Sequence, residues 1–127
     1  MNAKPPTLIL LSQFASSHGR IARAAWLGRL ILAGIACIAL GLLLQAVLGD
    51  NGPALASLLF LWCACCLTAK RLHDSGRTGW NLLFLLIPVL GPLWVLRLAL
   101  LRGSEGGNPY GRDPLTAPDY LHVDIAK

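Results

Sequence analysis

The sequence predicts an all-α, polytopic membrane protein that forms a single membrane domain over residues 1–127. Two observations predict this class. The chain is 55% hydrophobic and only 13% charged, whereas soluble domains carry about one quarter charged residues. Its apolar residues also form long runs with few charges inside them, and the mean hydropathy is +0.60. We expect a short N-terminal interfacial helix, two transmembrane helices and a third membrane segment broken by proline.

The formal net charge of +5 indicates membrane lipids rather than nucleic acid as the partner. A basic balance is also typical of nucleic-acid-binding domains. Here, however, the Lys and Arg residues stand beside apolar segments, where they orient a membrane protein and meet anionic lipid headgroups. The four cysteines lie inside the apolar runs, so we interpret them as small packing residues; they are Cys37, Cys63, Cys65 and Cys66.

The first apolar stretch, residues 7–18, is too short to span a bilayer. Because Gln13 interrupts it, we favour a helix that lies on the membrane surface. The alternative is a poor signal peptide, with Lys4 in its basic region and small residues after it. Arg20, Arg23 and Trp26 follow and mark a membrane–water interface.

Residues 30–49 contain no charged residue over twenty positions and would reach about 30 Å as a helix, which is one hydrocarbon core. This is the first predicted transmembrane helix. Ala33, Cys37 and Gly41 recur every four residues, and such a small-residue ridge lets helix backbones approach closely in lipid. We therefore expect the ridge to support packing against another helix, within a homo-oligomer or on a partner membrane protein. Gln45 continues the ridge.

Residues 49–53 read G-D-N-G-P and predict a tight turn. Residues 54–69 form the second predicted transmembrane helix. This helix is slightly short for a bilayer, but Lys70 and Arg71 can extend back to the interface.

The third apolar segment, residues 80–101, contains Pro88, Gly91 and Pro92 and cannot form one straight helix. Two geometries fit: one kinked span, or a re-entrant hairpin of two half-length helices. Length favours the span. Charge favours the hairpin, because the hairpin keeps the polar C-terminal segment, residues 102–127, on the side of the N-terminus. Arg97 would lie deep in the bilayer if the segment spans it, and nearer the membrane surface if the segment returns.

The positive-inside rule places the N-terminus and residues 70–79 in the cytoplasm of a bacterial cell. Both regions are rich in Lys and Arg, whereas residues 49–53 have neither. The positive residues that support this orientation are Lys4, Arg20, Arg23, Arg29, Lys70, Arg71 and Arg77. A hairpin would place a second group on the same side, comprising Arg102, Arg112 and Lys127.

Three polar blocks carry a resemblance to a known family. They read G-R-I-A-R-A-A-W (residues 19–26), R-L-H-D-S-G-R-T-G-W (residues 71–80) and G-S-E-G-G-N-P-Y-G-R-D-P (residues 103–114). Over about residues 14–114 the chain resembles the bacterial inner-membrane proteins catalogued as domain of unknown function 805. Ala25 departs from the pattern, which usually has an aromatic residue beside the Trp. The resemblance implies a multi-pass inner-membrane protein and brings no established activity.

The second block supplies the main candidate site. Arg71 and Asp74 are three residues apart and share a face if the preceding helix continues. Such a pair lowers the cost of each charge beside lipid, and His73 points elsewhere. One interpretation is a proton-linked or anion-binding site, and the other is a structural clamp. Gly76 and Gly79 permit a turn, with Trp80 as an interfacial anchor.

The third block would complete a shared platform if it returned to the same membrane face. Asn108 and Asp113 would then exchange hydrogen bonds with Arg20, Arg23 or Arg71, and Gly111 would shape the turn. Arginines with Asn and glycine amides around them suit an anionic lipid headgroup. The alternative is an ordered turn that only caps the helices.

No catalytic motif or metal-ligand spacing is present in the sequence, so we expect neither an enzyme nor a metal or other cofactor. His18, His73 and His122 are scattered along the chain. We therefore expect a structural or interaction protein that acts through helix packing and a basic membrane-surface face. The alternatives are an oligomeric small-solute or proton-linked transporter and an anionic-lipid-binding protein that uses Arg71, His73 and Asp74.

Overall fold

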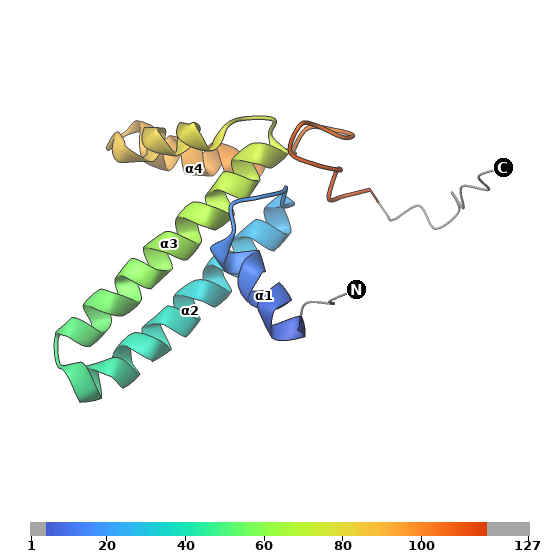
Figure 1. Ribbon diagram of the computed structural model, residues 1–127. Coiled ribbons are helices and arrows are strands. Elements are labelled where there is room, and N and C mark those ends of the chain that lie inside the picture. Colours follow the sequence, from blue (N-terminus) through green and yellow to red (C-terminus); the bar gives the residue numbers. More distant parts are fainter. Residues whose placement is uncertain (1–4, 117–127) are drawn as a thin grey trace.

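The computed structural model describes residues 5–116, and within that range it contains helices and loops but no β-strand (Figure 1). The sequence-based interpretations of Lys4, His122 and Lys127 fall outside the described residues. Five helical elements follow in order: α1 (Pro6–Ala15), α2 (Arg23–Leu48), α3 (Asn51–Asp74), the 3₁₀ helix η1 (Gly79–Leu86) and α4 (Leu90–Leu100).

Helices α2 and α3 are both long and apolar enough to cross a membrane. Each is longer than the apolar run that predicted it, because polar residues continue the helix at the same end of the molecule. Helix α2 begins at Arg23 rather than at residue 30, and α3 continues through the R-L-H-D sequence to Asp74. The charged ends can remain helical because loop segments satisfy their side chains, as described below.

The small-residue ridge of α2 faces α3 of the same chain. A Cβ atom added at Gly41 would lie 3.3 Å from the Cβ of Ala56, and Ala33 is also buried. Gly52, in the first turn of α3, also packs closely against α2. A Cβ atom added there would lie 2.5 Å from the backbone of Gln45. The close approach that the ridge predicts is therefore made within the chain, and Gln45 itself stays exposed.

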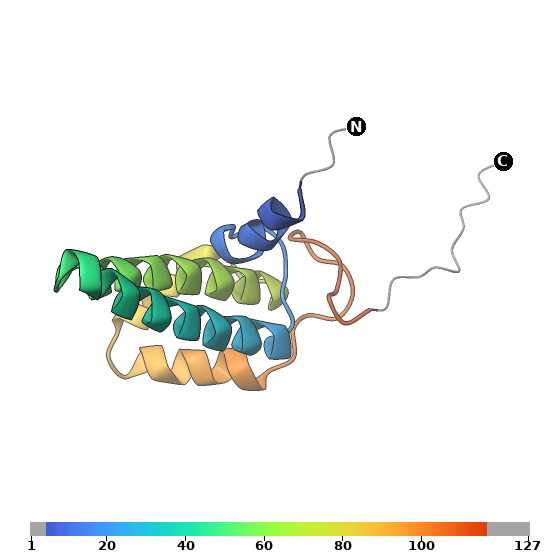
Figure 2. The same cartoon turned by 90° about the horizontal axis from the view of Figure 1, so that it is seen from below.

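Residues 80–101 form two short helices, η1 and α4, rather than one continuous helix. Pro88 lies in the turn between them, and Pro92 lies in the first turn of α4, where a proline removes no helical hydrogen bond. Gly91 packs against the backbone of Leu85, with a virtual Cβ only 2.8 Å from the Leu85 carbonyl oxygen. Helix η1 contacts α3 and α4 contacts α2, so the chain returns to the end of α3 from which it left (Figure 2).

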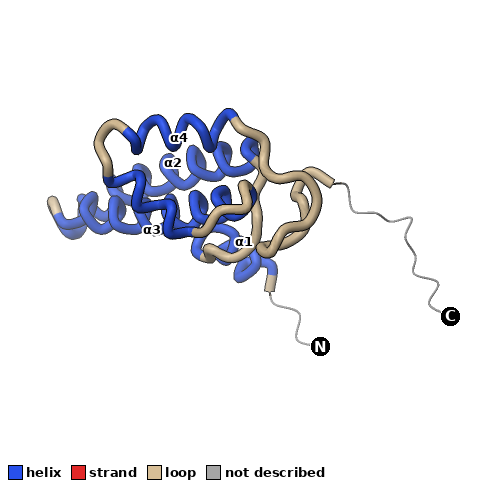
Figure 3. The backbone as a smooth tube through the Cα atoms, turned by 90° about the horizontal axis from the view of Figure 1, so that it is seen from above, coloured by secondary structure: helices blue, strands red, loops and turns tan. Residues whose placement is uncertain are grey.

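The α1–α2 linker, the turn after α3 and the loop after α4 gather at one end of the molecule, opposite the turn that joins α2 to α3 (Figure 3). The buried core lies at the same end and is formed by Ile21, Trp26, Leu67, Leu72 and Leu98. Trp26, which the sequence placed at a membrane–water interface, points into this core and is only 2% exposed. Elsewhere the large apolar side chains of α2 and α3 face outward, as expected of helices surrounded by lipid.

Candidate functional site

Asp74, the last residue of α3, is the centre of a buried ionic cluster that we call the Asp74 clamp: Asp74, Arg71 and Arg20. Arg71 pairs with the carboxylate from one turn earlier in the same helix. Arg20, from the linker between α1 and α2, donates through Nε to Asp74 Oδ1 at 3.0 Å, and its Nη2 lies 2.9 Å from the same oxygen. Arg71 and Asp74 are 0% and 1% exposed, respectively.

Both arginines of the clamp also bind backbone carbonyl groups of the C-terminal part of the chain. Arg20 donates to the carbonyl oxygens of Ser104 and Gly106, each at 2.6 Å. Arg71 donates to Leu98 at 2.9 Å and to Leu101. These last two carbonyls belong to the end of α4, where helical partners are missing. Arg71 therefore caps α4 from the end of α3.

The backbone of Asp74 holds the same loop. Its carbonyl oxygen accepts a hydrogen bond from the Ser104 amide at 2.8 Å and another from the Ser104 hydroxyl at 3.0 Å. Asp74 thus joins segments that are 54 and 30 residues away in sequence. Removing one partner from a buried ion pair leaves an uncompensated charge, so these segments depend on one another.

The third polar block folds over His73. The side-chain amide of Asn108 donates to the His73 carbonyl oxygen at 2.8 Å and to the Ser104 hydroxyl at 3.0 Å. The ring of Tyr110 stacks on the His73 ring, with centroids 4.1 Å apart. Asn108 and Gly111 exchange two backbone hydrogen bonds of 3.0 Å, which close the loop into a compact turn.

Asp113 fixes the loop rather than binding an arginine. Its carboxylate accepts hydrogen bonds from the amides of Leu115 at 2.9 Å and Gly106 at 3.3 Å. The Leu115 hydrogen bond is the main cause that lowers the pKa of Asp113; burial opposes it, and the Gly106 amide and nearby arginines add to it.

The remaining sequence-predicted residues lie around this cluster. Arg23 donates to the carbonyl oxygen of Leu100 at 2.9 Å, a second cap on the end of α4. Gly76 and Gly111 have positive φ angles of 68° and 138°, which favour glycine. Gly79 has no such angle and begins η1, where Trp80 is 79% exposed.

Comparison with known proteins identifies a family that covers most of the chain. The family model described as "Protein of unknown function (DUF805)" matches residues 14–112. The chain belongs to this family. It is 35% identical over 112 residues to Inner membrane protein YhaI of Escherichia coli K12, covering 84% of this chain and 92% of YhaI. It is 39% identical over 49 residues to Inner membrane protein YhaH of the same organism, covering 39% of this chain and 40% of YhaH. No solved structure matches it.

In this DUF805 protein the structure brings together six of the seven candidate polar residues. Most of them contact one another directly, and Arg20 and Asp113 both bind the backbone of Gly106. The six are Arg20, Arg71, His73, Asp74, Asn108 and Asp113. The seventh residue, Arg23, lies at the same end of the molecule and binds the last turn of α4. The expected hydrogen bonds from Asn108 and Asp113 to the arginines are not made, because the arginines bind backbone oxygens instead. A backbone carbonyl carries no sequence signature, so the sequence could not identify these acceptors.

Sequence reasoning missed several residues that hold the site. Lys70 donates to the Gln13 carbonyl oxygen at 2.7 Å and the Cys66 thiol donates to that of Ala15 at 3.3 Å, so α3 fixes the end of α1. Tyr110 was not singled out, although an aromatic residue inside a glycine-rich turn is a usable signal. Among residues 5–116 no group of three or more His, Cys, Asp and Glu side chains could hold a metal ion.

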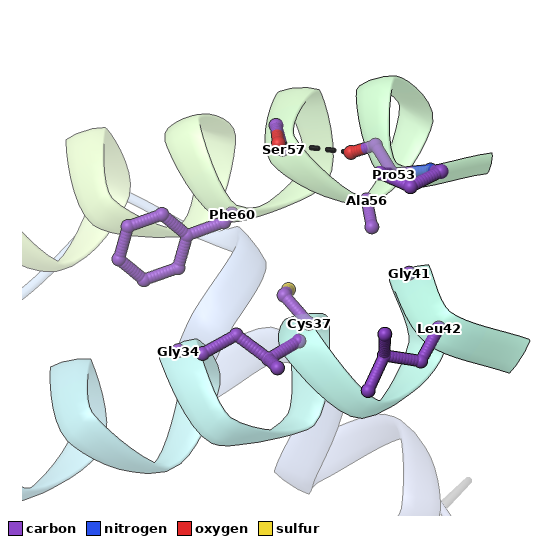
Figure 4. Close-up of a pocket in the computed structure, with 9 residues that line it drawn as sticks. Gly34, Cys37, Gly41, Leu42, Pro53, Ala56, Ser57 and Phe60 are labelled. Atoms are coloured by element: carbon purple, nitrogen blue, oxygen red, sulfur yellow. Dashed lines mark hydrogen bonds between the residues drawn. The ribbon is translucent and has the colours of Figure 1, made fainter. Parts of the chain in front are cut away.

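A second feature of this DUF805 protein is an apolar groove between α2 and α3 (Figure 4), on the halves of both helices nearer the turn that joins them. Its volume is about 400 Å³, and it runs along α2 from Gly34 past the ridge residues Cys37 and Gly41, facing Ala56 and Phe60 of α3. No charged side chain lines the groove. Its chemistry suits hydrocarbon, from a lipid chain or an apolar helix.

Proposed function

We propose that this protein is a structural or interaction protein of the bacterial inner membrane, with one polar platform on the cytoplasmic face. The observation that carries the proposal is the Asp74 clamp, because its hydrogen bonds join the N-terminal linker, the end of α3 and the loop after α4. Its charged atoms are occupied with one another and with backbone oxygens. This arrangement stabilises a platform and leaves little for chemistry on a substrate, which supports a non-enzymatic role.

The orientation follows from the positive charges. The clamp end holds Arg20 of the linker, Arg23 at the start of α2, and Arg77 and Arg102, whereas the turn between α2 and α3 has no Lys or Arg. The positive-inside rule then places the clamp end, with the N-terminus, in the cytoplasm. With both ends of residues 80–101 at this end, η1 and α4 form a re-entrant hairpin, and every positive block stays on one side.

Helix α1 completes the proposed platform as an interfacial helix. Its apolar residues are exposed, with Leu10 58% and Leu11 64% accessible, and ten residues cannot cross a bilayer. Lys70 and Cys66 hold its C-terminal end against α3 at the level of the clamp. Burial of α1 in the headgroup region of the bilayer would cover its exposed apolar side chains.

We further propose that partners include anionic lipids at the basic face and a neighbouring helix in the α2–α3 groove, from a second copy or another membrane protein. The groove supports this because small residues line it and close helix approach in lipid requires them. A proton-linked transporter would need Asp74 and His73 to carry the proton. Its support is weaker, since both oxygens of Asp74 bind arginines and His73 is stacked under Tyr110.

The experiment that tests the proposal is cysteine labelling with a membrane-impermeant thiol reagent. In a chain with the four native cysteines replaced, Glu105→Cys introduces a thiol in the third block, at a position whose side chain is 80% exposed. Asp50→Cys, in the exposed turn between α2 and α3, is the matched control. We expect Glu105→Cys to react only in inverted vesicles and Asp50→Cys only in intact spheroplasts. Reaction of both cysteines from the same side would overturn the proposed topology.

A further inference from the structure

Three arginines that the Asp74 clamp does not use surround a separate cavity of about 240 Å³. It lies between the turn after α3 and the last turn of α4. Arg77 reaches it from the turn, Arg97 from α4 and Arg102 from the loop that follows, and Trp94 forms part of the wall. The remaining lining residues are Ser75, Leu98, Leu101, Gly103 and Ser104.

Two arginines of this cavity lie over the same aromatic ring, and no carboxylate lines the cavity. The guanidinium carbons of Arg77 and Arg97 lie 5.2 and 5.5 Å from the centroid of the Trp94 ring, so one aromatic ring positions both charges. Within residues 5–116 neither side chain forms a salt bridge or a hydrogen bond. Arg102 approaches only Glu105, at 3.6 Å, and both side chains are largely solvent-exposed, a geometry that contributes little.

The negative end of helix α4, which would repel an anion, is already neutralised. Arg71 binds the carbonyl oxygens of Leu98 and Leu101, and Arg23 binds that of Leu100. The Asp74 carboxylate on the other side of the loop is paired with two arginines. The cavity therefore presents three guanidinium groups whose positive charge the surrounding protein does not neutralise.

We propose that this cavity binds the phosphate group of an anionic phospholipid. Arginine forks bind phosphate oxygens through paired charge-assisted hydrogen bonds, and basic pockets between membrane helices on the cytoplasmic side bind such headgroups. Leu98 and Leu101 line the cavity, and Leu100 beside them is 64% exposed, so acyl chains can continue along α4. The proposal rests on the cytoplasmic platform for its location, and it replaces Arg71, His73 and Asp74 as the lipid site.

The test is native mass spectrometry of the full-length protein in detergent, titrated with phosphatidylglycerol and, separately, with phosphatidylcholine. Arg97→Gln removes one fork of the cavity. Arg112→Gln is its matched control, because Arg112 is also an exposed arginine, lies in the third block and does not line the cavity. We expect Arg97→Gln to weaken phosphatidylglycerol binding by roughly tenfold or more, as for a lost charged hydrogen bond, and Arg112→Gln to leave it unchanged. Adding Arg77→Gln to Arg97→Gln should reduce binding to the phosphatidylcholine level.

Competition with inorganic phosphate then separates the two sources of the phosphate group. If phosphate displaces phosphatidylglycerol at matched concentrations, the site takes the free anion as well; if it does not, the lipid chains are required. Both results support a phosphate site. Equal binding of the two lipids, or equal losses in Arg97→Gln and Arg112→Gln, would overturn it. Because binding is measured in detergent, this outcome is independent of the labelling experiment that tests the membrane orientation.

Discussion

At the scale of single residues, four consecutive positions at the end of α3 hold three different parts of the chain. Arg71 binds the end of α4, His73 stacks under Tyr110 of the third block, and Asp74 pairs with Arg20 of the N-terminal linker. Helical geometry turns adjacent side chains by about 100°, so neighbours in sequence face different segments. The R-L-H-D sequence is therefore a junction between segments.

The first residue-scale prediction concerns the charge of Asp74. Asp74→Asn keeps the shape of the side chain but leaves Arg20 and Arg71 buried beside a neutral amide. We expect a loss of about 3–5 kcal/mol in the free energy of unfolding, as for a buried ion pair that has lost one partner. Thermal unfolding of the purified protein in detergent, followed by circular dichroism, measures it.

Glu105→Gln is the control for this change, because it removes the partly solvated pair with Arg102. Its expected effect is under about 1 kcal/mol. If Asp74→Asn were as stable as Glu105→Gln, the clamp would not be what joins the three blocks, and another contact would have to hold the third block in place.

At the scale of elements, glycine and proline determine where the membrane helices turn and how closely they pack. Pro88 separates η1 from α4, while Pro53 and Pro92 are accepted in the first turns of α3 and α4. Gly52 lies where the first turn of α3 meets the backbone of α2. These positions determine where the α2–α3 pair and the η1–α4 pair turn and how closely they approach.

We predict that Gly52→Ala disturbs the α2–α3 pair. The added Cβ would lie 2.5 Å from backbone atoms of Gln45 and Leu44, which cannot move aside as a flexible side chain can. The expected destabilisation is about 1–3 kcal/mol, as for an overpacked interior. It would be measured as a lower midpoint of thermal unfolding in detergent.

Gly28→Ala provides the comparison, since Gly28 also lies in a helix but a Cβ there meets nothing within 4 Å. We expect this substitution to be neutral or to stabilise α2 by up to about 1 kcal/mol through helix propensity. Equal melting points for the two variants would contradict the close backbone approach at Gly52.

At the scale of the whole molecule, polar and apolar surfaces are separated along the length of the helices. The clamp, the third block and the three arginines of the cavity lie at one end, where the linkers meet. The outward faces of α2, α3, η1 and α4 are apolar, for example Leu43 at 72% and Leu86 at 78% exposed. A surface of this kind is suited to the hydrocarbon interior of a membrane.

This separation yields a prediction about Val89, in the turn between η1 and α4. Val89 is 72% exposed in the protein, so the protein itself would not shield a cysteine there. If the hairpin re-enters the bilayer, Val89→Cys should resist an impermeant thiol reagent in both intact spheroplasts and inverted vesicles, and react fully once detergent removes the lipid. Reaction in inverted vesicles at the rate of Glu105→Cys would place the hairpin flat on the membrane surface instead.

The sequence by itself determined the class of the protein and its family. Long runs without charge are typical of membrane helices, so residues 30–49 and 54–69 are predicted to span a bilayer. Helix α2 covers the first run up to Leu48 and α3 contains the second, and both helices are long and apolar enough to cross a membrane. Pro88 and Pro92 were sufficient to predict a break in residues 80–101. The three polar blocks also identified the DUF805 family, which the family model confirms.

Only the tertiary structure decided what the polar residues bind. The i,i+3 spacing of Arg71 and Asp74 was visible in the sequence, but Arg20 joins them from 54 residues away, and the arginines bind carbonyl oxygens that any residue could provide. Similarly, Arg77, Arg97 and Trp94 meet only because residues 80–101 fold back. Periodicity and composition report local structure and burial, whereas these contacts depend on how distant segments return to one end of the molecule.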